Sequence, residues 1–210
     1  MEKKELERRM YNFEVRAENT ENGAILTGRP VVYNSRTDLG YFDEIIVSGA
    51  LDQTDLTDVR FLVNHNISNI PLARSRRNNG NSTMKLTPDQ FGLNMDFVQL
   101  DIENNSEAKS LYSAVNRGDI SGMSFMFSID AERWEDLETD HPTRYIEKIG
   151  SIVEISAVTF PAYDATTIQA RNKQALENAR VALENARNDA PEVDTSDLDL
   201  AKAKTLILRG

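Results

Sequence analysis

Hydrophobic and polar residues alternate along much of the chain between about residues 11 and 170, and a two-residue period is typical of strands. The run 59–65 alternates cleanly, which places His65 at the end of a predicted strand. The run 92–98 alternates in the same way. Asn79-Gly80 stands between two further strand-like runs, and this dipeptide tolerates the positive φ angles of a tight hairpin. This part of the chain therefore predicts a series of strands joined by turns.

Two more runs, 122–129 and 152–160, are rich in β-branched and aromatic residues and predict the strongest strands. The polar stretch 132–143 between them predicts a loop, and it contains His141. In the run 122–129, alternation places Ser124 on the opposite face from the bulky apolar side chains. A hydroxyl in the middle of such a strand is rigidly aimed.

One segment, 107–117, has apolar residues at helical spacing. Asn105 or Ser106 is a suitable N-cap, and Gly118 follows the last helical residue, where glycine commonly ends helices. A helix among many strands predicts an α+β class with a β-rich core.

The composition changes near Asn172, where a seven-residue echo begins, ALENAR at 175–180 and again at 182–187. Its alanines share one helical face, which predicts a helix that is either solvated or docked on a partner. The stretch 189–199 is polar and is expected to be flexible. We therefore predict a core domain over residues 1–171 and a helical tail with a flexible end over 172–210.

Composition and charge narrow the class of protein. The chain has 210 residues, 40% hydrophobic and 28% charged, which suits one folded domain with an appendage. A net charge of −10 argues against binding a phosphate backbone, so no nucleic-acid partner is expected. No apolar run is long enough to span a membrane, and the start MEKKELERRM has no apolar secretory core. We expect no membrane partner and a cytoplasmic setting.

The residues that could carry chemistry are few. The chain has no cysteine and two histidines, His65 and His141, so any imidazole-based site must use one of them. His141 stands beside several acids that could bind a hard cation, but these show no EF-hand spacing. Nucleotide-binding loops and zinc-protease motifs are not found. We expect no cofactor and no metal.

A nucleophilic serine needs a base within hydrogen-bond reach and a third group that orients the base. Ser124 and His65 both lie on predicted strands, although each also has a purely structural explanation. Glu154 lies within an apolar strand, where a carboxylate must be paired unless it faces water. Glu147 is a competing acid slightly earlier in the chain.

Four segments in this order resemble the HK97-type phage prohead protease family over about residues 11–171. They are FDEIIVSGAL at 42–51, VRFLVNHN at 59–66, GDISGMSF at 118–125 and VEISAVTFPAY at 153–163. The resemblance implies that His65 is the catalytic histidine and Ser124 the nucleophile. It places Glu154 as the orienting acid, with Glu147 and His141 as alternatives. Ala73 stands where family members commonly have glycine before an arginine.

The resemblance implies a serine endopeptidase that acts inside the immature phage head in the host cytoplasm. Its substrates would be the scaffold or the major capsid protein precursor, and the chain itself. It implies a barrel-like β core flanked by helices, similar in fold to the herpesvirus assemblins. Those proteases use a second histidine as the third residue of the catalytic triad. Self-association is a further expected contact, and the tail 172–210 is expected to serve assembly and to be removed by self-cleavage. A non-enzymatic capsid scaffold is the rival hypothesis.

Overall fold

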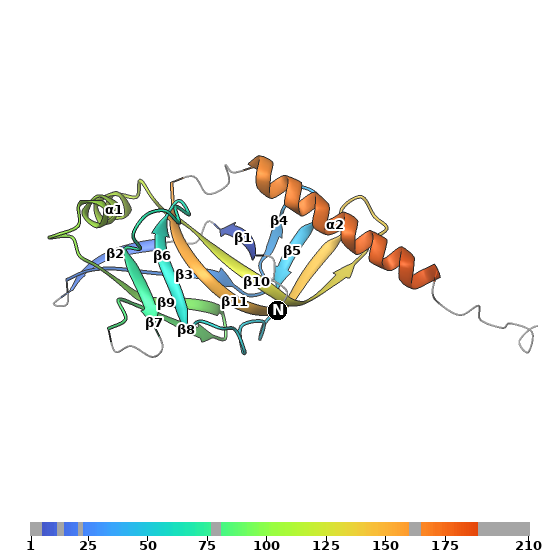
Figure 1. Cartoon of the computed structure of the whole chain (residues 1–210), viewed down its shortest axis with the longest axis horizontal. Helices are drawn as coiled ribbons and strands as arrows, with labels where there is room; N and C mark the ends of the chain where they lie inside the picture. The colour runs from blue at the N-terminus through green and yellow to red at the C-terminus, as the bar shows by residue number, and fades with distance from the viewer. Residues whose placement is uncertain (1–5, 12–14, 21–22, 77–80, 160–164, 189–210) are drawn as a thin grey trace, which may run out of the picture.

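The computed structural model describes residues 6–11, 15–20, 23–76, 81–159 and 165–188, and its strands form two sheets (Figure 1). The first sheet is ordered β1-β10-β11-β5-β4, with β6 beside β11 and β7 beside β6. Its strands are β1 (Leu6–Tyr11), β4 (Arg36–Asp38), β5 (Asp43–Ile46), β6 (Asp58–Val63), β7 (Ala73–Arg76), β10 (Gly122–Glu135) and β11 (Thr143–Val158). The second is ordered β2-β3-β9-β8 and comprises β2 (Val15–Thr20), β3 (Gly23–Val32), β8 (Met84–Asp89) and β9 (Gly92–Leu100).

The predicted α+β class is confirmed, and so is a C-terminal helix. The described strands form two open sheets and do not close into a barrel. The two helices of the described chain are α1 (Ser106–Arg117) and α2 (Ala165–Asn188). Neither is long and apolar enough to cross a membrane.

Strands β10 and β11 form a long curved hairpin, which crosses the centre of the molecule in Figure 1. The predicted strands 122–129 and 152–160 are parts of it. Strand β10 ends at Glu135 and β11 begins at Thr143, so the loop between them is shorter than the predicted 132–143. Met123, Phe125 and Phe127 of β10 are fully buried in the core shared with the second sheet. Alternation then places Ser124 on the outer face of the first sheet.

Helix α1 forms as its sequence predicts. The Asn105 side chain accepts hydrogen bonds from the N–H groups of Glu107 and Ala108, at 3.0 and 3.1 Å, and so caps the N-terminus. Gly118 adopts a left-handed conformation, with φ of 80°, and ends the helix. The apolar face packs into the core through Ala108, Leu111 and Val115.

The tight hairpin predicted around Asn79-Gly80 is not formed by two strands of one sheet. Strand β7 pairs with β6, whereas β8 pairs with β9 in the other sheet. A backbone hydrogen bond from Thr83 to Arg74, at 3.0 Å, links the two sheets here. Asn79 and Gly80 themselves lie outside the described residues. The chain therefore uses this connection to pass from one sheet to the other.

Helix α2 begins at Ala165, before the domain boundary predicted at residue 172, and the division into two domains stays a prediction. Leu176 is buried, and the Arg180 guanidinium donates to the carbonyls of Leu137 and Thr139 at 3.1 and 2.8 Å. The helix therefore docks on the β10–β11 turn of its own chain. The buried residues of this helix are Asn172 and Leu176, not the alanines of the repeated sequence. The stretch 189–199, which the sequence predicts to be flexible, lies outside the described residues.

Candidate active site

His65 lies two residues beyond the end of β6, not within the strand as the alternation predicted. Asn64 and His65 both have positive φ angles, 50° and 57°, which turn the chain sharply over β11. Asn tolerates this conformation well. The side-chain oxygen of Asn64 accepts a hydrogen bond from the backbone N–H of Thr159 at 2.9 Å. The backbone N–H of Asn64 donates to the Ala157 carbonyl, also at 2.9 Å. The turn is therefore tied to β11 on both sides.

The imidazole of His65 is held by Glu154. His65 Nδ1 lies 2.7 Å from Glu154 Oε2, and the two side chains are only 5% and 3% exposed. Burial of a carboxylate is unfavourable without a partner, so this pair explains how Glu154 is accommodated in an apolar strand. An acceptor at Nδ1 favours the tautomer in which Nδ1 carries the proton. Nε2 then keeps its lone pair and can act as a base.

Ser156 completes this arrangement and was not predicted from the sequence. Its hydroxyl donates to Oε1 of Glu154 and accepts from the backbone N–H of His65 at 3.0 Å. One side chain thus connects the acid to the backbone of the histidine. The available signal was its position two residues after Glu154, which places both side chains on one face of β11.

Ser124 lies on the neighbouring strand, directly opposite Ser156 in the β10–β11 register. It is fully buried, and its hydroxyl donates to the backbone carbonyl of Arg9 in β1 at 2.7 Å. His65 Nε2 is buried as well and has no hydrogen-bond partner among the described residues. The three predicted residues are therefore on one face of the sheet, with the acid and the histidine in contact and the serine bonded to a different partner.

The two alternative third members lie elsewhere. Glu147 is exposed and pairs with Arg133 at 3.0 Å. It precedes Glu154 by seven residues of the same strand, which is roughly 23 Å at the usual strand rise. His141 is exposed at the far end of the hairpin and lies 3.2 Å from Asp43. Neither contacts His65, whereas Glu154 does.

His141, Asp38 and Asp43 form a group whose candidate ligand atoms lie within 4.8 Å of one another. The acids that the sequence placed beside His141, such as Glu138 and Asp140, are not part of this group. His141 and Asp38 are exposed, and such groups are common on protein surfaces without an ion. The expectation of no metal stays a prediction.

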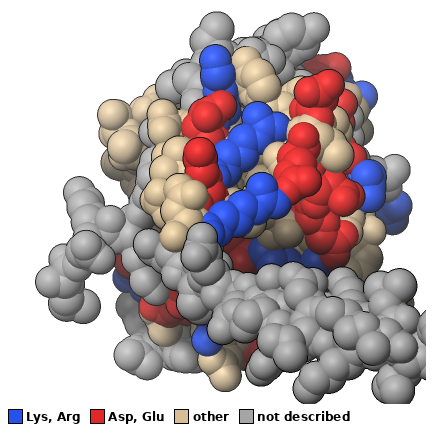
Figure 2. Space-filling view, turned by 90° about the vertical axis from the view of Figure 1, so that its right-hand side faces the viewer, with Lys and Arg blue, Asp and Glu red and all other residues tan. Residues whose placement is uncertain are grey.

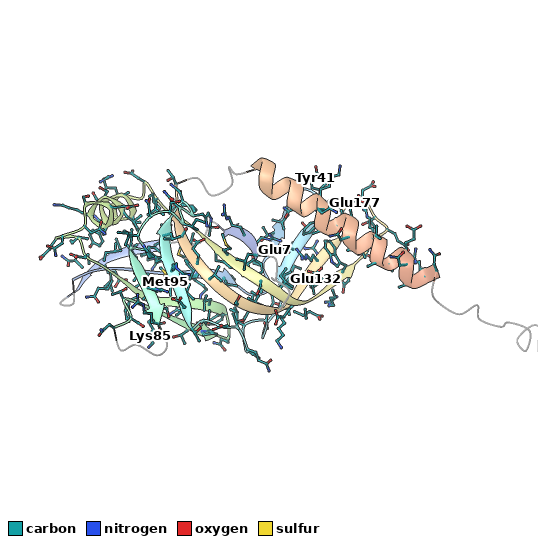
Figure 3. The ribbon with its side chains drawn as sticks, viewed as in Figure 1. Glu7, Tyr41, Lys85, Met95, Glu132 and Glu177 are labelled. Carbon is teal, nitrogen blue, oxygen red and sulfur yellow. The ribbon has the colours of Figure 1, made fainter. Side chains whose placement is uncertain are left out.

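A second buried cluster, on the inner face of the sheet, was missed by the sequence analysis. The guanidinium of Arg144 is 4% exposed and bonds Glu7 of β1 and Glu132 of β10, which Figure 3 labels. It also lies 3.4 Å from the fully buried Glu44, which it faces in the β5–β11 register. Arg9 of β1 makes two hydrogen bonds to Glu44, one of them 2.6 Å long. We call these five residues the buried charge cluster.

Contacts within the cluster shift the pKa values of two of its members, Glu7 and Arg144. Burial would raise the pKa of the Glu7 carboxyl, but the cations of Arg9 and Arg144 outweigh burial and lower it. Burial would lower the pKa of Arg144, but the anions of Glu7 and Glu44 outweigh burial and raise it. Glu7 and Arg144 therefore each favour the charged form in the presence of the other members.

The end of the molecule near the β10–β11 turn is lined by exposed ion pairs. Arg36 pairs with Asp43 at 2.7 Å, and Arg133 pairs with Glu147 and Glu135. Figure 2 shows basic side chains in the middle of this end, with acidic side chains on either side. Despite its net charge of −10, the protein does not present a uniformly acidic surface at this end.

A histidine oriented by a buried carboxylate, with a serine on the same face of the sheet, is the set of groups that serine hydrolases use. The family model described as caudovirus prohead serine protease matches residues 11–180. The chain therefore belongs to the caudovirus prohead serine protease family and is a serine peptidase of phage capsid maturation. No curated protein and no solved structure gives a significant match. The relation in fold to herpesvirus assemblins stays a prediction.

Proposed function

We propose that Ser124, His65 and Glu154 form the catalytic triad of this peptidase. The supporting observation is the buried contact between His65 Nδ1 and Glu154 Oε2, which leaves Nε2 available as a base with no partner in the described part of the chain. The substrates are the scaffold or the major capsid protein precursor inside the immature head, and the chain itself. The family assignment favours this enzyme over the non-enzymatic scaffold that the sequence left open.

In the proposed reaction, His65 Nε2 takes the proton of the Ser124 hydroxyl as Oγ attacks the scissile carbonyl carbon. Glu154 stabilises the imidazolium that forms, because its carboxylate accepts from Nδ1–H. The peptide C–N bond then breaks, and His65 passes the proton to the leaving amine. Water releases the acyl group from Ser124 by the same proton route. Ser156 acts as a positioning residue, since it holds Glu154 and the backbone of His65 at once.

Co-expression with the capsid protein precursor tests this proposal. Ser124→Ala should abolish detectable processing on a gel, because loss of a nucleophilic serine lowers turnover about a million-fold in a comparable triad. Ser128→Ala is the matched control, since Ser128 lies on the same strand and bonds Ser151 instead. Normal processing by Ser124→Ala would refute the assignment. Capsid assembly without any cleavage by the native chain would restore the scaffold hypothesis.

A further inference from the structure

Strand β1 covers the nucleophile. It pairs antiparallel with β10 from Leu6 opposite Ser128 to Tyr11 opposite Met123, and it forms the edge of the first sheet in the described chain. Met10 stands directly opposite Ser124, and the preceding carbonyl, that of Arg9, accepts the Ser124 hydroxyl. An added strand along a sheet edge is also a common way in which proteins bind extended peptides. β1 is therefore placed as such a peptide would be.

The side chain of Arg9 holds β1 in this position. It projects to the inner face and is 4% exposed. Its Nε and Nη2 atoms bond both oxygens of Glu44, and its Nη1 bonds the Arg8 carbonyl at 3.0 Å. The guanidinium carbon lies 5.8 Å from the centre of the Phe127 ring. A bidentate pair with a fully buried carboxylate is a specific anchor for a planar cation.

Building on the proposed function, we propose that β1 is a built-in pseudo-substrate, which occupies the place along β10 where substrate segments bind. The protease is latent while β1 is docked. Substrates bind in its place with a basic side chain at the position of Arg9, and the bond after that residue is cleaved. The part of the chain that matches the family begins at residue 11, so the anchor Arg9 lies outside the matched region.

The state of the hydroxyl explains the latency. The proton of Ser124 is donated to the Arg9 carbonyl oxygen, while the buried His65 Nε2 accepts from no donor among the described residues. Without a hydrogen bond to its base, the serine is a weak nucleophile. Departure of β1 releases the hydroxyl, which is then free to donate to Nε2.

The charges left behind explain the preference for a basic residue. When β1 leaves, it removes Glu7 and Arg9 from the buried charge cluster. Glu44 and Glu132 then share Arg144, so two carboxylates face one guanidinium. Glu44 is fully buried and needs a replacement cation. An arginine or lysine of the incoming segment supplies it, whereas an acidic residue adds a third negative charge.

Labelling of Ser124 by a fluorophosphonate probe tests the proposal on the full chain. Arg9→Ala should react roughly tenfold faster than the native chain or more, because the open state gains population when a charge-assisted anchor is lost. Arg29→Ala, which breaks the pair with Asp89 in the other sheet, should react at the native rate. Added hexapeptide LERRMY, the sequence of β1, should slow labelling of Arg9→Ala, and LERAMY should not.

Equal labelling rates for the native chain and Arg9→Ala, with labelling lost in Ser124→Ala, would overturn the pseudo-substrate and leave the proposed function intact. No labelling of any variant would overturn both. If circular dichroism shows Arg9→Ala to be unfolded, Glu7→Gln takes its place, since it weakens the bonds of β1 to Arg144 from the partly exposed side of the cluster. Faster cleavage by that variant of peptides with arginine than with glutamate before the scissile bond supports the preference, and the reverse order refutes it.

Discussion

His65 Nδ1 and Glu154 Oε2 lie 2.7 Å apart in a part of the protein that solvent barely reaches. The two residues are far apart in the chain and meet because β6 runs parallel to β11, with Val63 opposite Ala157. The turn after Val63 then brings the histidine back over the strand. This one contact separates Glu154 from the other two candidates for the orienting residue, because Glu147 pairs with Arg133 and His141 lies beside Asp43.

Replacing Glu154 tests its role as the orienting acid. Glu154→Gln should lower kcat by about 10⁴-fold, because an amide no longer selects the correct tautomer or stabilises the imidazolium. The rate of precursor cleavage measures this. His141→Ala and Glu147→Gln are matched controls and should remain close to native. Loss of activity in His141→Ala with an active Glu154→Gln would instead support a Ser-His-His site.

Ser156→Ala should lower kcat by roughly tenfold or more while leaving KM near its native value, because the hydroxyl holds the acid and the histidine but does not touch substrate. Ser156→Thr keeps the hydroxyl in a residue that suits a strand and should recover most of the rate. A fall in protein stability without a change in kcat would show that Ser156 is only structural.

Acid should weaken the docking of β1 through Glu7. The pKa of this carboxyl is lowered from the ordinary 4.5, so its contribution to stability is present above that pH and is lost as the pH falls through the folded value. The free energy of unfolding should therefore differ between the native chain and Glu7→Gln at neutral pH, and the difference should shrink in acid. Urea titrations at several pH values measure it. A difference that stays constant with pH would contradict the linkage.

Glu44→Ala should cost about 3–5 kcal/mol in the free energy of unfolding, because it leaves the buried guanidinium groups of Arg9 and Arg144 without their shared carboxylate. Glu135→Ala breaks the exposed pair with Arg133 and should change stability little. Chemical denaturation of the two variants beside the native chain provides the comparison. Equal effects would mean that the buried cluster is not a determinant of stability.

Local patterns predicted the parts of this fold that depend on neighbouring residues. The caps at Asn105 and Gly118 are local, and so α1 has nearly the predicted bounds. The two-residue period placed Ser124 on the opposite face from Phe125, as in the structure. His65 lies beyond its predicted strand because the end of β6 is set by a turn with positive φ, which alternation does not register.

The remaining features depend on contacts between distant segments. The Arg9–Glu44 pair joins residues 35 positions apart across two strands that are not neighbours in the sheet. Its two residues look like ordinary surface charges in the sequence, and only tertiary burial makes them an anchor. That β7 and β8 belong to different sheets also depends on tertiary contacts, because the local sequence of both segments is compatible with a hairpin between them. Ser156 has no distinguishing pattern without its partner His65.

The pairing of β10 with β11 ties the position of the proposed nucleophile, Ser124, to correct folding. A slip of one residue would turn Ser124 toward the core and, in the same movement, carry Phe125 out of the core to the opposite face of the sheet. A misaligned hairpin would therefore displace the proposed nucleophile and take Phe125 out of the core at once, so the same error would disable the proposed site and destabilise the fold. For a serine peptidase of phage capsid maturation, this means that chains that fold correctly also have the proposed nucleophile in place.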